Sequence, residues 1–134
     1  MDTLQGSCLC AAVTFEVINT FEHFQLCHCY QCQKTTGSAH ASNLFTSPQN
    51  ITWLTGRHLI SRYNVPNRRI SNAFCQHCGS RTPFLSLSGE ILAVPAGSLN
   101  GKPNILAQGN IFWSERAVWY DQAAGARRYQ NFIE

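Results

Sequence analysis

The chain has 134 residues, a formal net charge of +3 and 44% hydrophobic residues, which suits one domain over residues 1–134 and excludes a globally disordered chain. Its basic residues never run longer than pairs, its apolar stretches are too short to cross a bilayer, and its N-terminus lacks the features of a signal peptide. We therefore expect a cytoplasmic protein without a nucleic-acid or membrane partner.

Short segments of alternating polarity recur along the chain, and the first covers residues 11–18. There Val13, Phe15 and Val17 share one face, while Thr14 and Glu16 take the other. Further strands are expected at residues 39–45, 57–63, 83–87 and 91–94, each bounded by Gly, Pro, Asn or Ser. Five scattered prolines disfavour long helices, and a helical turn is expected only after residue 121. The pattern predicts a mainly β fold of small antiparallel sheets.

The cysteines form three groups: Cys8 and Cys10; Cys27, Cys29 and Cys32; Cys75 and Cys78. Their clustering argues against isolated cysteines that only fill a core. Their odd number and the reducing compartment argue against a disulfide framework. Zinc accounts for the spacing, because thiolates hold it in a tetrahedron.

The two pairs together supply four thiolates. If Cys8 and Cys10 lie on an extended strand, they point to the same face. A C-x-x-C turn places Cys75 and Cys78 on one metal, and Gly79 supplies a residue that is free to take a positive φ. A closed site of four thiolates is structural as a rule.

The triplet then offers three ligands and one open position, which is the pattern of a catalytic zinc site. Another division stays open, in which Cys29 and Cys32 join the C-x-x-C pair and the remaining three cysteines are left over. His28 and His77 sit beside ligands, and an extended backbone would turn both away from the metal. We expect neither histidine to bind zinc.

Five motifs occur in order: "GSCLCAAVTFEV" at residues 6–17, "CHCYQCQKTTGS" at 27–38, "FCQHCGS" at 74–80, "GSL" at 97–99 and "IFWSERAVWY" at 111–120. This pattern resembles the glutathione-dependent formaldehyde-activating enzyme family, whose domain is shared with centromere protein V. The resemblance covers residues 6–120 and leaves residues 121–134 as a C-terminal tail. It implies a β-tent-like domain with structural zinc on the two cysteine pairs and a second, labile zinc on the triplet.

The resemblance also implies an activity, the reversible joining of a thiol to an aldehyde. The chain would then be a carbon–sulfur lyase similar to S-hydroxymethylglutathione synthase, acting on glutathione or another thiol and on formaldehyde or a related aldehyde. Zinc could stabilise the substrate thiolate or polarise the aldehyde oxygen. Three thiolates on Zn²⁺ leave about one net negative charge, which makes the ion a poorer Lewis acid and favours the first role. A non-catalytic, zinc-stabilised binding module is the alternative.

Glutathione carries two carboxylates, which need cations or backbone N–H groups. Proximity to the triplet favours Lys34 and the turn with Thr36, Gly37 and Ser38 as the substrate-binding residues. The arginines are further candidates: Arg57, Arg62, Arg68, Arg69 and Arg81.

The sequence departs from the common family pattern at three positions. Ala11 stands where Gly is usual, Gln33 where Arg is common, and Asn100 where Asp is common. None of these changes removes a cysteine, but Gln33 lies next to the triplet and bears on the identity of the substrate.

Overall fold

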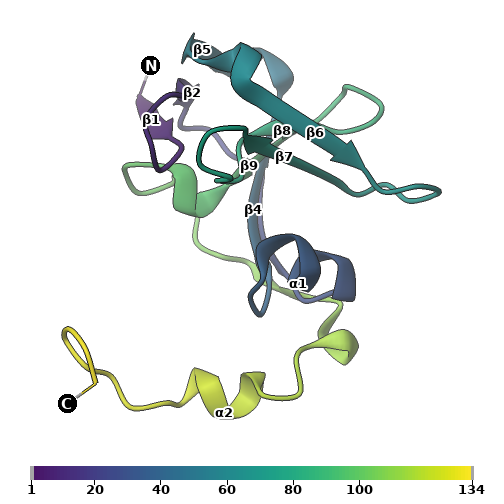
Figure 1. The fold of residues 1–134 in the computed structure, drawn as a ribbon, viewed down its shortest axis with the longest axis vertical. Coiled ribbons are helices and arrows are strands. Elements are labelled where there is room, and N and C mark those ends of the chain that lie inside the picture. Colours follow the sequence, from purple (N-terminus) through teal and green to yellow (C-terminus); the bar gives the residue numbers. More distant parts are fainter. Residues whose placement is uncertain (1, 134) are drawn as a thin grey trace.

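Short strands dominate the computed structural model, which describes residues 2–133 (Figure 1). The strands are β1 Thr3–Ser7, β2 Thr14–Ile18, β3 His23–Cys27, β4 Ala41–Thr46, β5 Ile51–Thr55, β6 Ile60–Asn64, β7 Ser71–Cys75, β8 Phe84–Leu85, β9 Leu92–Pro95 and β10 Gly109–Ile111. The α-helices are α1 Tyr30–Thr36 and α2 Tyr120–Ala124. Single 3-10 turns cover Pro48–Asn50, Arg57–Leu59, Ala96–Ser98 and Trp113–Glu115.

The strands form three small sheets. Their orders are β1-β2-β5, β10-β3-β4-β9-β8 and β6-β7. All pairs are antiparallel except β3 with β10, where Cys27 lies opposite Ile111. The prediction of a mainly β fold of small antiparallel sheets is confirmed, with this one parallel pair as an addition.

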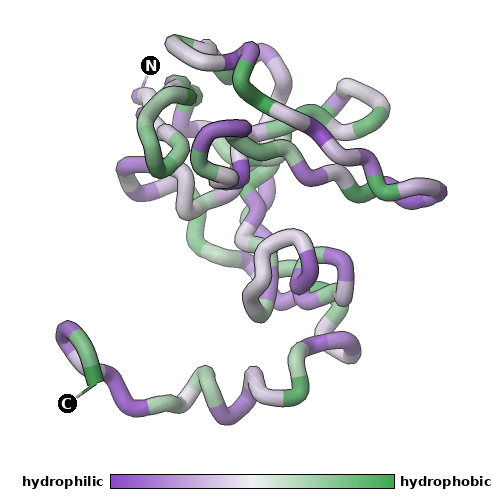
Figure 2. Tube along the Cα trace, viewed as in Figure 1, coloured by the Kyte–Doolittle hydropathy of each residue, from purple (hydrophilic) through white to green (hydrophobic). Residues whose placement is uncertain are grey.

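The largest core cluster lies between the first two sheets. Phe15 and Val17 from β2 pack with Leu44 from β4, and Leu92 and Val94 from β9 complete the cluster with less than 3% of each side chain exposed. The predicted inward face of residues 11–18 is therefore buried as expected. In Figure 2 the strands of the upper part carry hydrophobic stretches interrupted by hydrophilic ones.

Each cysteine group lies at the centre of a smaller cluster of its own. Cys8 and Cys75 pack with Val13, and the triplet packs with Ala41. Members of both groups therefore lie inside packed parts of the domain.

The C-terminal segment leads away from the sheets and carries α2 (Figure 1). Every described residue from 121 onward is exposed. Within residues 2–133, no helix combines the length and apolar character needed to cross a membrane.

Candidate functional site

The two cysteine pairs meet although 65 residues separate Cys10 from Cys75. Cys8 directly follows β1, Cys75 ends β7, and all four sulfur atoms lie within 4.8 Å of one another. The Cys8 and Cys10 sulfurs are 3.6 Å apart, and those of Cys10 and Cys75 are 3.9 Å apart. Thiolates at about 2.3 Å from a tetrahedral zinc lie about 3.8 Å from each other. The donor set and its spacing fit zinc.

The C-x-C pair lies in a turn, so the expectation of an extended strand at Cys8 and Cys10 is wrong. The Ala11 N–H donates to the Cys8 carbonyl (3.1 Å), and Ala11 takes a φ of 64°. The Val13 N–H donates to the Cys8 sulfur at 3.3 Å. A turn brings the two sulfurs to one point because the chain reverses around them, with a backbone N–H directed at one thiolate.

Ala11 occupies a left-handed conformation, which costs an alanine about 1–2 kcal/mol. Glycine avoids that cost. Its greater freedom in the unfolded chain, however, lowers the free energy of unfolding by about 0.4–1 kcal/mol. We therefore expect Ala11→Gly to stabilise the zinc-loaded protein by roughly 1 kcal/mol and to raise its melting temperature by about 2–5 °C. Ala12→Gly is the matched control, since Ala12 has no positive φ, and it should lower the melting temperature. A lower value for Ala11→Gly as well would contradict this account.

The Cys78 thiol of the four-cysteine group has a strongly lowered pKa. Its hydrogen bond with the Ser80 hydroxyl (3.3 Å) is the main reason that this pKa falls to about 5. The same hydroxyl oxygen accepts from the Leu9 N–H at 3.0 Å. Ser80 therefore ties the two cysteine turns together beside the sulfurs, and Gly79 has the positive φ expected of it (75°).

The triplet gathers where β3 ends and α1 begins. Cys27 is the last residue of β3, Cys29 is the N-cap of α1, and Cys32 lies in its first turn. All three are buried, and their sulfur atoms lie within 4.8 Å of one another. Among residues 2–133, no fourth His, Cys, Asp or Glu joins this group. The donor set suits zinc and leaves one tetrahedral position to something other than these side chains.

Helix α1 corrects the expectation that helical structure occurs only after residue 121. The Cys29 sulfur accepts the Cys32 N–H at 3.3 Å, in the manner of an N-cap side chain. At the other end Gly37 takes a φ of 63° and its N–H donates to the Gln33 carbonyl (2.8 Å). No sequence signal predicted this helix, because cysteine is not among the usual N-caps.

The three thiols of the triplet do not share one pKa. A hydrogen bond from the Cys32 thiol lowers the pKa of Cys27 to about 6, and the same bond, together with burial, raises the pKa of Cys32. Burial raises the pKa of Cys29. The group therefore holds one thiolate near neutral pH, a form able to bind metal, and protons compete with metal for it as the pH falls below about 6.

His28 points away from the sulfurs into an aromatic cluster. Its ring is fully buried and lies 4.8 to 5.1 Å, between centroids, from those of His40, Trp113 and Tyr120. Its Nε2 is 2.8 Å from the Asn110 side-chain oxygen. The residue between the first two cysteines of the triplet is thereby anchored to the C-terminal part of the chain, which fixes how those two cysteines are presented.

Gln33 also serves the backbone rather than the cavity. Its side-chain nitrogen donates to the His28 carbonyl at 2.8 Å and to the Glu115 carbonyl at 2.9 Å. The residue that departs from the family pattern, Gln33, therefore connects α1 to the segment after β10 by a hydrogen bond.

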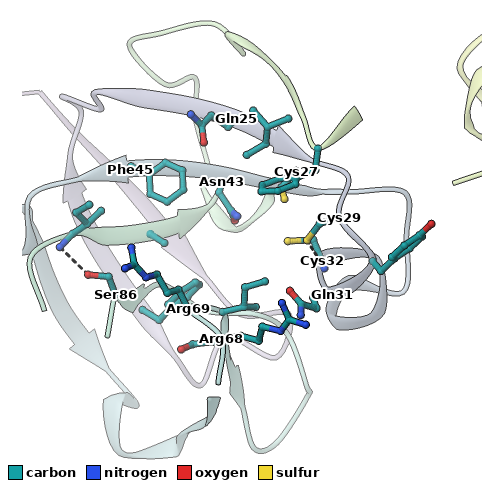
Figure 3. Close-up of a pocket in the computed structure, with 18 of the residues that line it drawn as sticks. Gln25, Cys27, Cys29, Gln31, Cys32, Asn43, Phe45, Arg68, Arg69 and Ser86 are labelled. Carbon is teal, nitrogen blue, oxygen red and sulfur yellow. Dashed lines mark hydrogen bonds between the residues drawn. The ribbon is translucent and has the colours of Figure 1, made fainter. Parts of the chain in front are cut away.

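A cavity of about 580 Å³ opens beside the triplet (Figure 3). All three cysteines line it, and Phe45, Ile70 and Ile111 contribute to an apolar wall. Figure 3 shows the cysteines at one side, Asn43 and Phe45 along the top, and Arg68 and Arg69 along the lower side. A volume of this size is typical of small-molecule sites, of about 300–1,000 Å³.

The substrate-binding residues suggested by the sequence do not line this cavity. Lys34 lines a neighbouring recess of about 340 Å³, which shares only Tyr30 and Gln31 with the main cavity. Thr36, Gly37 and Ser38 line neither space. A role for these four residues stays a prediction.

Several cavity residues could not have been found from sequence. Asn43 on β4 and Glu115 after β10 come together with the triplet only through the β3–β4 and β3–β10 pairings. Of the five candidate arginines, the cavity lining includes Arg68, Arg69 and Arg81. No local pattern distinguishes these three from the other two.

Small sheets and two groups of clustered cysteines that could each hold a metal ion define a mainly β protein with candidate metal sites. The profile of the family described as "glutathione-dependent formaldehyde-activating enzyme" matches residues 3–115. The chain belongs to that family.

Comparison with solved structures supports the fold. A crystal structure of a Rhodobacter sphaeroides protein is 24% identical in sequence, with a TM-score of 0.59, and the match covers 75% of this chain and 91% of that one. At this identity the likeness concerns the fold alone. No curated protein matches the sequence significantly.

Proposed function

We propose that the chain is a zinc-dependent carbon–sulfur lyase that reversibly adds a thiol such as glutathione to formaldehyde or a related aldehyde. The observation that carries this proposal is the position of the triplet, three buried thiols without a fourth ligand among the described residues, in the wall of a cavity. Membership of the formaldehyde-activating family supports the same chemistry.

In this proposal the two cysteine groups have different roles. Cys8, Cys10, Cys75 and Cys78 hold a structural zinc, because four thiolates close the site. Cys27, Cys29 and Cys32 hold a labile, catalytic zinc. The second ion is the more easily removed, since it has one protein ligand fewer.

Zinc at the triplet would keep a substrate thiol deprotonated at neutral pH. In the forward direction the thiolate sulfur attacks the aldehyde carbon, a carbon–sulfur bond forms, and the carbonyl electron pair moves to oxygen, which takes up a proton. The reverse reaction returns the proton, the thiolate and the aldehyde. The apolar wall from Phe45, Ile70 and Ile111 limits water around the reacting atoms.

The activity test is exchange spectroscopy by NMR on glutathione mixed with formaldehyde. Zinc-loaded protein should accelerate exchange between free and hydroxymethylated glutathione above the rate in protein-free buffer. The acceleration should disappear after mild chelation that removes the labile zinc and should return when zinc is restored. Tightly held zinc in the four-cysteine group without any acceleration would favour the binding-module alternative.

The proposed compartment is the cytoplasm. All seven cysteines are free thiols in the structure, and sites built from thiols need a reducing environment to stay intact.

A further inference from the structure

Unpaired cations face the same cavity as the triplet. Arg68, Arg69 and Arg81 line it, and Glu115 is the only acidic residue in the lining. The Glu115 carboxylate accepts the Tyr30 N–H at 3.2 Å. None of the three arginines has a carboxylate within 4 Å, since the one ion pair within residues 2–133 joins Arg116 to Asp121. Three guanidinium groups against one carboxylate and the one thiolate of the triplet leave an excess of positive charge in the lining.

Arg81 is the most enclosed of the three. It follows the Cys78 turn, and its backbone forms an isolated antiparallel β-bridge with Phe74 on β7. Its Nε donates to the Asn72 side-chain oxygen at 2.9 Å. Burial lowers the pKa of its guanidinium. Within residues 2–133 no acceptor is found for its two Nη atoms, although partial burial makes an unpaired cation costly. A guanidinium held by one bond and free on its forked end suits a carboxylate.

Arg68 and Arg69 lie on the turn that joins β6 and β7. The turn is held by the Val65 N–H, which donates to the Ile70 carbonyl (2.9 Å), and by the Arg68 N–H, which donates to the Val65 carbonyl (3.2 Å). Both side chains are exposed, and Figure 2 shows the turn as a hydrophilic tip at the right-hand edge. They add positive charge at the cavity mouth, where solvent screens it.

Asn43 adds a polar group inside the cavity. Its side-chain oxygen is buried and has no hydrogen-bond partner among the described residues, and the side chain lies in the lining near the cysteines (Figure 3). A buried acceptor without a donor is costly. A ligand N–H, such as that of a peptide group, would satisfy it.

We propose that Arg81 is the residue that makes this cavity specific for anionic thiols, with Arg68 and Arg69 steering them in and Asn43 accepting a ligand N–H. The position of the ligand sulfur at the triplet rests on the proposed function. The recognition of the carboxylate does not, because the arginines would bind it whether or not a reaction follows. Neutral thiols of similar size are then poor ligands.

The test uses S-methylglutathione, which keeps both carboxylates but has no free thiol to bind zinc. Calorimetry on zinc-loaded protein should show that Arg81→Gln weakens its binding by about ten-fold or more, as expected for a charge-assisted, partly enclosed hydrogen bond. Arg81→Lys should recover part of the affinity, because it keeps the charge without the fork. The double variant Arg68→Gln/Arg69→Gln should lose only about two- to five-fold, and that loss should shrink at high salt.

Arg57→Gln is the matched control. Arg57 packs over the Trp53 ring, 5.8 Å from its centroid, and lines a different cavity. This variant should bind S-methylglutathione like the wild type. Thermal melting checks that Arg81→Gln is folded. If it is not, the dimethyl ester of S-methylglutathione decides on wild-type protein, where binding about ten-fold weaker than that of the free acid is expected.

Unchanged affinity in Arg81→Gln, equal binding of acid and ester, or no binding of S-methylglutathione by the wild type would each overturn the inference. The proposed function fails separately. Arginine-dependent binding without any acceleration of the formaldehyde reaction keeps the inference and removes the function. If the protein accelerates the reaction of acidic and neutral thiols alike, and Arg81→Gln does not change this, the proposed function stands and the inference is overturned.

Discussion

Cys75→Ser should leave the chain largely unfolded. Cys75 is completely buried at the end of β7, beside Cys8 and Val13. Its loss opens the four-cysteine site, and the zinc binding that disappears is folding free energy, on the order of 10 kcal/mol. A typical domain has a total stability of only about 5–15 kcal/mol. Circular dichroism and the yield of soluble protein measure the effect.

Ala73→Ser is the control for this variant. Ala73 lies two residues earlier on β7, on the same face, and is equally enclosed at 2% exposure. The change buries a new hydroxyl without touching a ligand and should cost only about 1–3 kcal/mol. If Cys75→Ser melts as high as Ala73→Ser and keeps its metal, the four-cysteine group is not the structural site.

Cys29→Ser should instead keep the fold and lose the activity. Serine is a favoured N-cap, so its hydroxyl can take over the Cys32 N–H that the Cys29 sulfur accepts. The variant removes one of the three ligands proposed for the labile zinc, and we expect that ion to be lost while the other is retained. Formaldehyde exchange should drop to the protein-free rate. Elemental analysis, circular dichroism and the NMR assay give the three readouts.

Cys29→Ala separates the two roles of this residue. It removes the ligand and the cap together, so it should match Cys29→Ser in zinc content and activity but be less stable by about 0.5–2 kcal/mol. Global unfolding of the serine variants at Cys27, Cys29 and Cys32 alike would place the triplet in a structural site and would refute the division of roles.

Most of the strands and the grouping of the cysteines could be predicted from the sequence. Val13, Phe15 and Val17 alternate with polar neighbours, and this local period determines their burial. Gly79 follows a C-x-x-C pair and takes the positive φ that such a turn favours. In each case a few adjacent residues hold the whole signal.

The features that sequence missed depend on distant segments or on unusual local chemistry. The β3–β10 pair joins Cys27 to Ile111, and three residues are too few to produce a recognisable pattern. Helix α1 is capped by a sulfur. Arg68 and Arg69 look like a solvated pair on a turn, and they are exposed, but the fold of β6 and β7 also places them at a cavity.

The parallel pairing of β10 with β3 sets an order of events during synthesis. Cys78, the last residue of the four-cysteine group, leaves the ribosome before Ile111, which belongs to the β10 neighbour of the strand that carries Cys27. At about 5–20 residues per second, that interval lasts roughly 2–7 s. We therefore expect the four-cysteine group to close while the triplet still lacks one wall. A chain stalled with Cys78 outside the ribosome and Ile111 still inside should bind one zinc tightly and leave the triplet thiols open to alkylation.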